Sequence, residues 1–145
     1  MSKVEDFLSA QEEQEIVEAI LQAEKNTSGE IRVHLESHTR LDHFDRAKEV
    51  FHILKMDNTK EENGVLIYVA VNDKKFAICG DKGIHKVVPP NFWETTKDVI
   101  QNHFSKGNYK EGIVAGILKA GIELESHFPW RHGDINELSN EVSKG

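Results

Sequence analysis

Two stretches of the sequence decide the fold: Thr27-Ser28-Gly29-Glu30-Ile31-Arg32-Val33 and, further along, Asn63-Gly64-Val65-Leu66-Ile67-Tyr68-Val69-Ala70-Val71. In each stretch a glycine-containing turn signal leads directly into a run of apolar and β-branched residues, which is typical of a strand. Each stretch also places an acidic or amide side chain at the entrance of its strand. If the two strands lie side by side, Glu30, Glu62 and Asn63 gather at one end of a sheet, where their oxygen atoms would suit a cation.

The bulk composition indicates a single globular domain. The 145 residues match the length of one ordinary domain, and contents of 38% hydrophobic and 30% charged residues exclude a disordered chain. A net charge of −7 repels phosphate backbones, so nucleic acid is not expected as a partner and a cation is the more natural ligand.

The sequence also predicts a cytoplasmic protein without a membrane anchor. It contains no apolar run of about 18 residues, and Met1–Leu8 lacks the basic segment and apolar core of a signal peptide. A single cysteine, Cys79, cannot form an internal disulfide, which agrees with a reducing compartment. We expect a monomer in the cytoplasm, with Cys79 as a buried structural thiol.

Residue periodicity predicts the order helix, strand, helix, strand, strand, helix, helix. The predicted helices cover residues 9–26, 44–54, 92–104 and 109–127, and the predicted strands cover residues 31–36, 65–71 and 76–79. The first two strands should be parallel and joined by a right-handed crossover, with the third returning as an antiparallel hairpin strand. This predicts a single-domain, three-layer α/β/α sandwich with a small mixed sheet over residues 1–130. Residues 131–145 form a polar tail, expected to dock weakly or not at all.

The hairpin should return Gly80-Asp81-Lys82-Gly83 to the end of the sheet where the parallel strands begin. The strongest candidate site is therefore the cluster of Glu30, Glu62, Asn63 and Asp81. Hard cations such as Ca²⁺ take six to eight oxygen ligands from carboxylates, amides, backbone carbonyls and water. The alternative is a polar sheet edge in which Glu30 caps a backbone group and Asp81 makes an Asx turn.

A second candidate site follows from the rule that open α/β sheets bind ligands beyond the carboxyl ends of their parallel strands. That end of the predicted sheet carries Ser37, His38, Thr39, Asp42 and Asp73. The histidines lack the spacing of a zinc site and are expected on the surface. No nucleophile elbow, P-loop or dinucleotide fingerprint is present, so the sequence shows no complete catalytic constellation.

The motifs also resemble a known family, the TPM domain, often labelled "TPM phosphatase". The resemblance runs from about Phe7 to Pro129, and the ending His127-Phe128-Pro129 is similar to the short, soluble branch of the family. It rests on the order of five motifs: Thr-Ser-Gly-Glu-Ile-Arg-Val at 27–33, Ala-x-x-Val-Phe at 47–51, Asn-Gly-Val-Leu-Ile at 63–67, Asp-x-Lys at 73–75 and Gly-Asp-x-Gly-Ile at 80–84.

The resemblance implies an α/β/α sandwich that holds a divalent cation in a crevice between loops, onto which Glu30, Asn63 and Asp81 map. It also implies a weak, acid-phosphatase-like activity, which is associated with a chloroplast branch of the family. Many relatives carry an acidic residue where Pro90 stands here, and its loss weakens the expected site unless Asn91 or Glu94 compensates. Many relatives also carry a signal peptide and a membrane helix, so their location is not transferred.

The favoured prediction is a soluble accessory or regulatory domain that binds a divalent cation, Ca²⁺ before Mg²⁺. Its predicted ligands are Glu30, Glu62, Asn63, Asp81 and Glu94. One alternative is a metal-assisted phosphatase acting on phosphomonoesters. Another is a protein-interaction module that uses residues 128–130 and the polar tail to bind an unidentified protein partner.

Overall fold

The computed structural model describes residues 7–130 and 138–145, so the first half of the predicted tail lies outside the described residues. Four strands form one mixed sheet in the order β3-β2-β1-β4. The elements follow one another as α2 (Ala10–Ala23), β1 (Glu30–Glu36), α3 (His43–Ile53), β2 (Gly64–Ala70), β3 (Lys75–Gly80), α4 (Lys82–His85), α5 (Glu94–Phe104), α6 (Tyr109–His127) and β4 (Ser143–Lys144).

The register of the sheet confirms the predicted parallel pair and hairpin. β1 and β2 are parallel from Glu30 opposite Gly64 to Glu36 opposite Ala70. β2 and β3 are antiparallel, with Val65 opposite Gly80. The start of β1, the start of β2 and the end of β3 therefore meet at one end of the sheet, as the sequence predicts.

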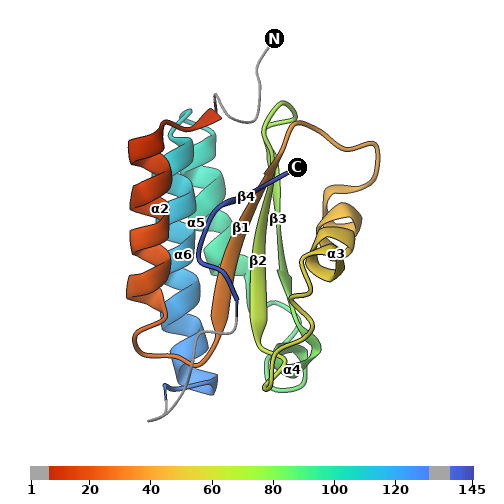
Figure 1. Ribbon diagram of the computed structural model, residues 1–145, viewed down its shortest axis with the longest axis vertical. Helices are drawn as coiled ribbons and strands as arrows, with labels where there is room; N and C mark the ends of the chain where they lie inside the picture. The colour runs from red at the N-terminus through yellow and green to blue at the C-terminus, as the bar shows by residue number, and fades with distance from the viewer. Residues whose placement is uncertain (1–6, 131–137) are drawn as a thin grey trace.

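Helices cover both faces of this sheet and produce three layers (Figure 1). Helices α2, α5 and α6 form one layer, and α3 lies on the opposite face, where it contacts β2 and β3. The predicted α/β/α sandwich is thus confirmed. No helix in residues 7–130 or 138–145 combines the length and the apolar character needed to cross a membrane.

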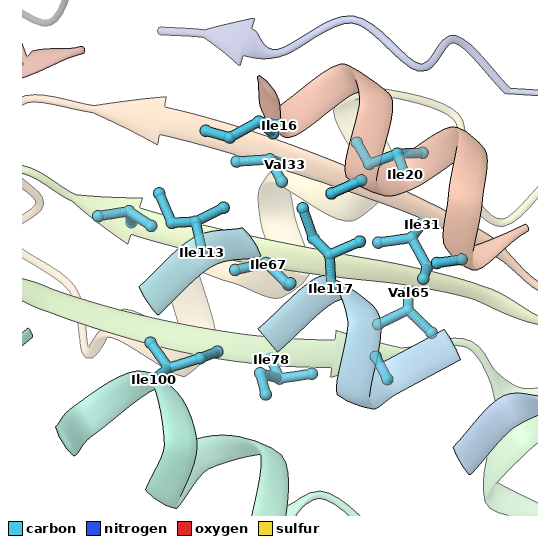
Figure 2. Packing of buried hydrophobic residues seen from close by; sticks show 14 of the residues in the cluster. Ile16, Ile20, Ile31, Val33, Val65, Ile67, Ile78, Ile100, Ile113 and Ile117 are labelled. Carbon is cyan, nitrogen blue, oxygen red and sulfur yellow. The ribbon is translucent and has the colours of Figure 1, made fainter. Parts of the chain in front are cut away.

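Alternation along the strands creates two separate cores. Side chains of one parity, such as Ile31, Val33 and Ile67, face the three-helix layer and pack against Ile16, Ile20 and Ile117, as Figure 2 shows. Side chains of the other parity face α3 in a smaller cluster that holds Leu66, Tyr68 and Cys79. Because β2 is buried on both faces, its sequence is an uninterrupted apolar run.

Local sequence signals set the helix boundaries. A capping box is present at α2, where the Ser9 hydroxyl accepts from the amide of Glu12 and the Glu12 carboxylate accepts from the amide of Ser9. Asp42 caps α3 in the same manner, by accepting from the amides of Phe44 and Asp45. These caps satisfy amide groups that a helix leaves without internal partners.

Small residues on α6 allow its neighbours to approach closely. A Cβ atom at Gly116 would lie 2.6 Å from the side chain of Ile100 on α5, and one at Gly121 would lie 2.7 Å from the Cβ of Ala23 on α2. No real side chain tolerates such distances. The glycines of this helix therefore allow close packing against α5 on one side and α2 on the other.

Two elements were not predicted. The short helix α4 follows directly from β3, and β4 adds a fourth strand at the β1 edge, where Ser143 lies opposite His34. The expectation of a tail that docks weakly or not at all is wrong for residues 138–145, because Val142 and Leu138 pack against the two cores. The proposed division at residue 130 stays a prediction.

Candidate functional site

The backbone brings the predicted site residues to one end of the sheet. Glu30 lies opposite Gly64 in the β1–β2 register, and the amide of Asp81 donates to the carbonyl of Gly64 at 2.9 Å. Glu30, Gly64 and Asp81 therefore form one row across three strands, with their α-carbons on the α3 side. Adjacent strands are about 4.8 Å apart, so Glu30 and Asp81 start from backbone positions roughly 10 Å apart.

Two of the predicted ligands already serve structural roles. Glu30 is buried, and its Oε1 accepts a hydrogen bond from the amide of Leu138 at 2.6 Å. The side-chain amide of Asn63, also buried, donates to the hydroxyl of Ser28 at 3.2 Å. The capping role that the sequence offered as an alternative for Glu30 is thus present, although the backbone group it binds belongs to the tail.

The loop that precedes β2 meets the turn after β3 beside these residues. Glu62 has a φ of 53°, a left-handed conformation that non-glycine residues adopt rarely. The carbonyl oxygens of Glu61 and Glu62 lie so close to Gly83 that a Cβ there would collide with both. The two loops therefore touch through bare backbone, which directs carbonyl oxygens toward the turn that carries Asp81.

Asp81 has one carboxylate oxygen that accepts a hydrogen bond and one that does not. Its Oδ1 caps α4 by accepting from the amide of Lys82 at 2.7 Å. Its Oδ2 is buried and has no hydrogen-bond partner among the described residues. Burial raises the pKa of Asp81, and the negative charges of Glu62 and Asp57 raise it further. A buried carboxylate oxygen without a donor is costly, and a bound cation would remove that cost.

Burial also affects polar groups of Thr59 and Glu24 at this end of the sheet. The Thr59 hydroxyl oxygen, in the loop before β2, is buried and also lacks a partner among the described residues. Burial raises the pKa of Glu24 to about 7, although its Oε2 accepts from the amide of Ile31 at 2.8 Å, and the charge of Glu30 contributes to the rise. Burial therefore raises the pKa of two acidic side chains at this end, Glu24 and Asp81.

One positive charge lies beside these acidic groups. The ammonium group of Lys82 lies 2.8 Å from the carboxylate of Glu62. The Lys82 side chain is 67% exposed, so it pairs with Glu62 from the solvent side. Because an ion pair of this kind contributes little to stability, Lys82 can leave Glu62 at small cost.

The structure does not bring all the predicted ligands together. Glu94 begins α5 and forms an exposed ion pair with Lys97 on its own helix, at 3.7 Å. Among the residues that the structure describes, no three Asp, Glu, His or Cys side chains are grouped so that they could hold a metal ion. A cation at this end would therefore depend on two carboxylates, those of Glu62 and Asp81, completed by backbone carbonyls and water.

The opposite end of the sheet contains a polar network that the sequence did not predict. The carboxylate of Glu36 accepts from the guanidinium of Arg46 at 2.7 and 2.9 Å and from the hydroxyl of Tyr68 at 2.5 Å. Burial alone would raise the pKa of Glu36, but these hydrogen bonds outweigh it and lower the pKa to about 2. Arg46 completes its set of contacts with an ion pair to Glu49.

His34 belongs to the same network and corrects the expectation that the histidines are on the surface. It is buried, its Nδ1 lies 2.9 Å from the hydroxyl of Ser143, and its Nε2 lies 3.5 Å from Glu36. Burial lowers the pKa of His34 despite the nearby carboxylate. The imidazole is therefore held mainly in its neutral form.

The second predicted site is satisfied internally. Asp73 accepts from the amide of Thr39 at 3.3 Å and lies 3.2 Å from Nε2 of His43, which lowers the pKa of Asp73. Asp42 is used as the cap of α3. These side chains hold the loops at the carboxyl ends of β1 and β2.

One signal could have revealed the unpredicted network. Glu36 shares a strand face with His34, and the parallel register places Tyr68 opposite His34. An acidic residue and a histidine on a face that also carries a tyrosine indicate a buried polar cluster once the register is known. Register comes from the pairing of strands, which the sequence of one strand does not specify.

The fold matches one class of protein, the TPM domain. The model of that family matches residues 1–122, and the chain belongs to the TPM domain family. The expected family resemblance is thereby confirmed. No curated protein matches the sequence.

Solved structures give the same result. The BA42 protein of the psychrophilic bacterium Bizionia argentinensis is 63% identical, over 100% of both chains, with a TM-score of 0.93. The N-terminal domain of a P. gingivalis protein is 22% identical, with 87% of this chain and 83% of that chain covered and a TM-score of 0.68. At that identity the second likeness shows the fold alone.

Proposed function

We propose that this chain is a TPM domain that binds a divalent cation, Ca²⁺ in preference to Mg²⁺, in the crevice between the loop before β2 and the turn after β3. The observation that carries the proposal is the buried Oδ2 of Asp81, which lacks a hydrogen-bond donor among the described residues. A carboxylate in that position gains most from a ligand that brings positive charge. The role of the domain is accessory or regulatory.

The chemistry of the crevice favours a hard cation. Asp81 and Glu62 supply carboxylate oxygens, and the backbone near Gly83 supplies carbonyl oxygens. Ca²⁺ accepts such mixed and irregular oxygen sets, whereas Mg²⁺ demands near-ideal octahedral geometry. With only two carboxylates, the expected dissociation constant is about 10⁻⁴ to 10⁻³ M, the range of weak calcium sites.

The ion pair between Lys82 and Glu62 leads to a specific prediction about cation binding. Its ammonium group occupies the Glu62 carboxylate at 2.8 Å in the absence of a metal. A bound cation would take over that carboxylate, and Lys82 would move into the solvent. Lys82 and the metal therefore compete, so removal of the lysine should strengthen binding while removal of Asp81 should weaken it.

Isothermal titration calorimetry with CaCl₂ and MgCl₂ tests the proposal on the whole protein. We expect Asp81→Asn to lower Ca²⁺ affinity at least tenfold, because asparagine keeps the cap of α4 but loses the charge. We expect Lys82→Ala to raise the affinity. Asp98→Asn, an exposed position on α5, is the matched control and should leave the affinity unchanged.

Opposite effects at neighbouring residues cannot arise from a general loss of folding. Absence of Ca²⁺ binding at millimolar concentration would refute the proposal. Equal binding by the wild-type protein and Asp81→Asn would move the cation elsewhere. A phosphatase activity, if measured, should require the cation and should fall in Asp81→Asn, because the crevice itself offers no evident nucleophile.

A further inference from the structure

Two turns of the chain are in contact at the amino end of the sheet. One turn is formed by residues 59–62 in the loop before β2, and the other by residues 81–83 after β3. A Cβ atom at Gly83 would collide with the carbonyl oxygens of Glu61 and Glu62, so the two turns touch through their backbones. Figure 1 shows α4, which begins in the second turn, beside the loop between α3 and β2.

Each of these turns carries one buried oxygen atom without a hydrogen-bond partner. The two atoms are Oγ1 of Thr59 and Oδ2 of Asp81, and both residues are only 7% exposed. A third unpartnered group, Nε1 of Trp93, packs in the core of the three-helix layer and can only donate a hydrogen bond. Among the described residues at this end, Thr59 and Asp81 are therefore the two that offer an unused lone pair.

The loop that carries Thr59 has a fixed backbone. Lys55 and Glu62 have φ values of 57° and 53°, in the left-handed region that non-glycine residues adopt rarely. The amide of Glu62 donates to the carbonyl of Thr59 at 3.3 Å, and Met56 is fully buried beneath the loop. Because the loop is held in this way, the Thr59 hydroxyl stays buried, and leaving it without a partner costs free energy.

The charges around the two oxygen atoms are mainly negative. Asp57 and Glu62 lie on either side of Thr59 in the sequence, and both raise the pKa of Asp81. The Thr59 hydroxyl would relieve Asp81 by donating to its Oδ2, yet neither atom has a partner among the described residues. Both oxygen atoms are thus available to one positively charged ligand between the turns.

We propose that the Thr59 hydroxyl is a further ligand of the divalent cation, which binds between the two turns with Thr59 on one and Asp81 on the other. This inference rests on the proposed cation site. Ca²⁺ takes neutral oxygen atoms alongside carboxylates, and its six to eight ligands leave room for another protein oxygen. Thr59 supplies such an oxygen without adding charge.

Thr59→Val is the main test, because valine keeps the branched shape of threonine and lacks the hydroxyl. In calorimetry with CaCl₂ on the full chain, we expect Thr59→Val to lower the affinity roughly fivefold and Thr59→Ser to stay within about twofold of the wild type. Thr95→Val, the same substitution at an exposed position on α5, is the matched control and should leave the affinity unchanged.

Thermal unfolding in EDTA separates a ligand from a structural residue. If Thr59 serves the ion, Thr59→Val should be at least as stable as the wild type without metal, because an apolar group of the same shape replaces a hydroxyl that has no partner. If Thr59 instead supports the loop, the variant should lose stability in EDTA as well.

The water molecules bound to the ion give a second readout that packing alone would not change. Eu³⁺ serves as the probe in place of Ca²⁺, and its luminescence lifetimes in ordinary and heavy water report how many water molecules it holds. We expect Thr59→Val to add about one water molecule, since water takes the position of the lost oxygen.

The outcomes distinguish this inference from the proposed function. Absence of Ca²⁺ binding by the wild-type protein would overturn both. Ca²⁺ binding that is equally tight in the wild type and Thr59→Val, with the same number of bound water molecules on Eu³⁺, would overturn the role of Thr59 and leave the site in place. A loss of affinity together with a loss of stability in EDTA would also overturn it, because Thr59 would then hold the loop rather than the ion.

Discussion

The pKa values of acidic side chains are shifted in opposite directions at the two ends of the sheet. At the carboxyl end, Glu36 is matched by Arg46 and Tyr68, and its pKa falls to about 2. At the amino end, burial raises the pKa of Glu24 to about 7 and also raises that of Asp81. Glu36 and Asp81 are both 7% exposed, so the difference between these two carboxylates comes from the donors supplied. The Glu36 carboxylate finds its partners within the chain, whereas the Oδ2 of Asp81 lacks a hydrogen-bond donor among the described residues.

Arg46→Ala should have the largest effect on stability, because it leaves the Glu36 carboxylate buried without its main partner. We expect the free energy of unfolding at pH 7 to fall by about 3 kcal/mol in urea denaturation. Lys48→Ala, on the same helix with an exposed partner, should change it by less than about 0.5 kcal/mol.

The pH dependence of that stabilisation has a definite sign. The pKa of Glu36 is lowered in the folded state, so its contribution is complete above pH 4.5 and is lost as the pH falls toward 2. The difference in the free energy of unfolding between the wild-type protein and Arg46→Ala should therefore become smaller as the pH falls over this range. A constant gap down to pH 2 would show that Arg46 acts through packing alone.

Glu24 should give the reverse pH dependence at the other end. Its folded pKa is raised from 4.5 to about 7, so the folded state holds the proton after the unfolded chain has released it. The resulting stabilisation is present below pH 4.5 and is lost as the pH rises to 7, by roughly 2–3 kcal/mol. Glu24→Gln should flatten this profile and be more stable than the wild type at pH 8, as chemical denaturation will show. An unchanged profile would contradict the account.

Asp81→Asn should increase stability in metal-free buffer by about 1 kcal/mol, because it removes an unsatisfied buried charge and keeps a helix cap. Thermal unfolding with EDTA measures this gain. With saturating Ca²⁺ the order should reverse, since ligand binding stabilises only the protein that retains the site. A variant less stable than the wild type in EDTA would mean that Oδ2 has a partner within the chain.

Glu94→Gln should produce the smallest effect. Glu94 is exposed and pairs within α5, so the structure supports it least among the predicted ligands. We expect less than a twofold change in Ca²⁺ affinity by calorimetry. A tenfold loss would show that the start of α5 closes over the crevice when the cation binds.

Most of the fold could be predicted because its elements carry local signals. The capping box at Ser9, the apolar run of β2 and the turn before β3 each specify an element through nearby residues. The strand β4 carries no such signal, since it is two residues long and exists only because β1 offers an edge. The helix α4, only four residues long, depends on Asp81 as its cap.

The candidate site could be predicted in position but not in detail. The hairpin argument correctly brought Asp81 to the end of the sheet that carries Glu30. It could not show that Glu30 binds the amide of Leu138 or that Glu24 is buried, because these depend on contacts between distant parts of the chain. The Glu36–Arg46–Tyr68 network was missed for the same reason.

The most direct test of the comparison is a Ca²⁺ titration of the wild-type protein followed by amide NMR. The account predicts saturable shifts confined to the amino end, at Gly29–Ile31, Glu62–Gly64 and Gly80–Gly83, with Asp81→Asn unresponsive. Shifts centred on Ser37–Asp42 and Asp73 would contradict it, because the end of the sheet whose charges are already matched would then be the one that binds the ion.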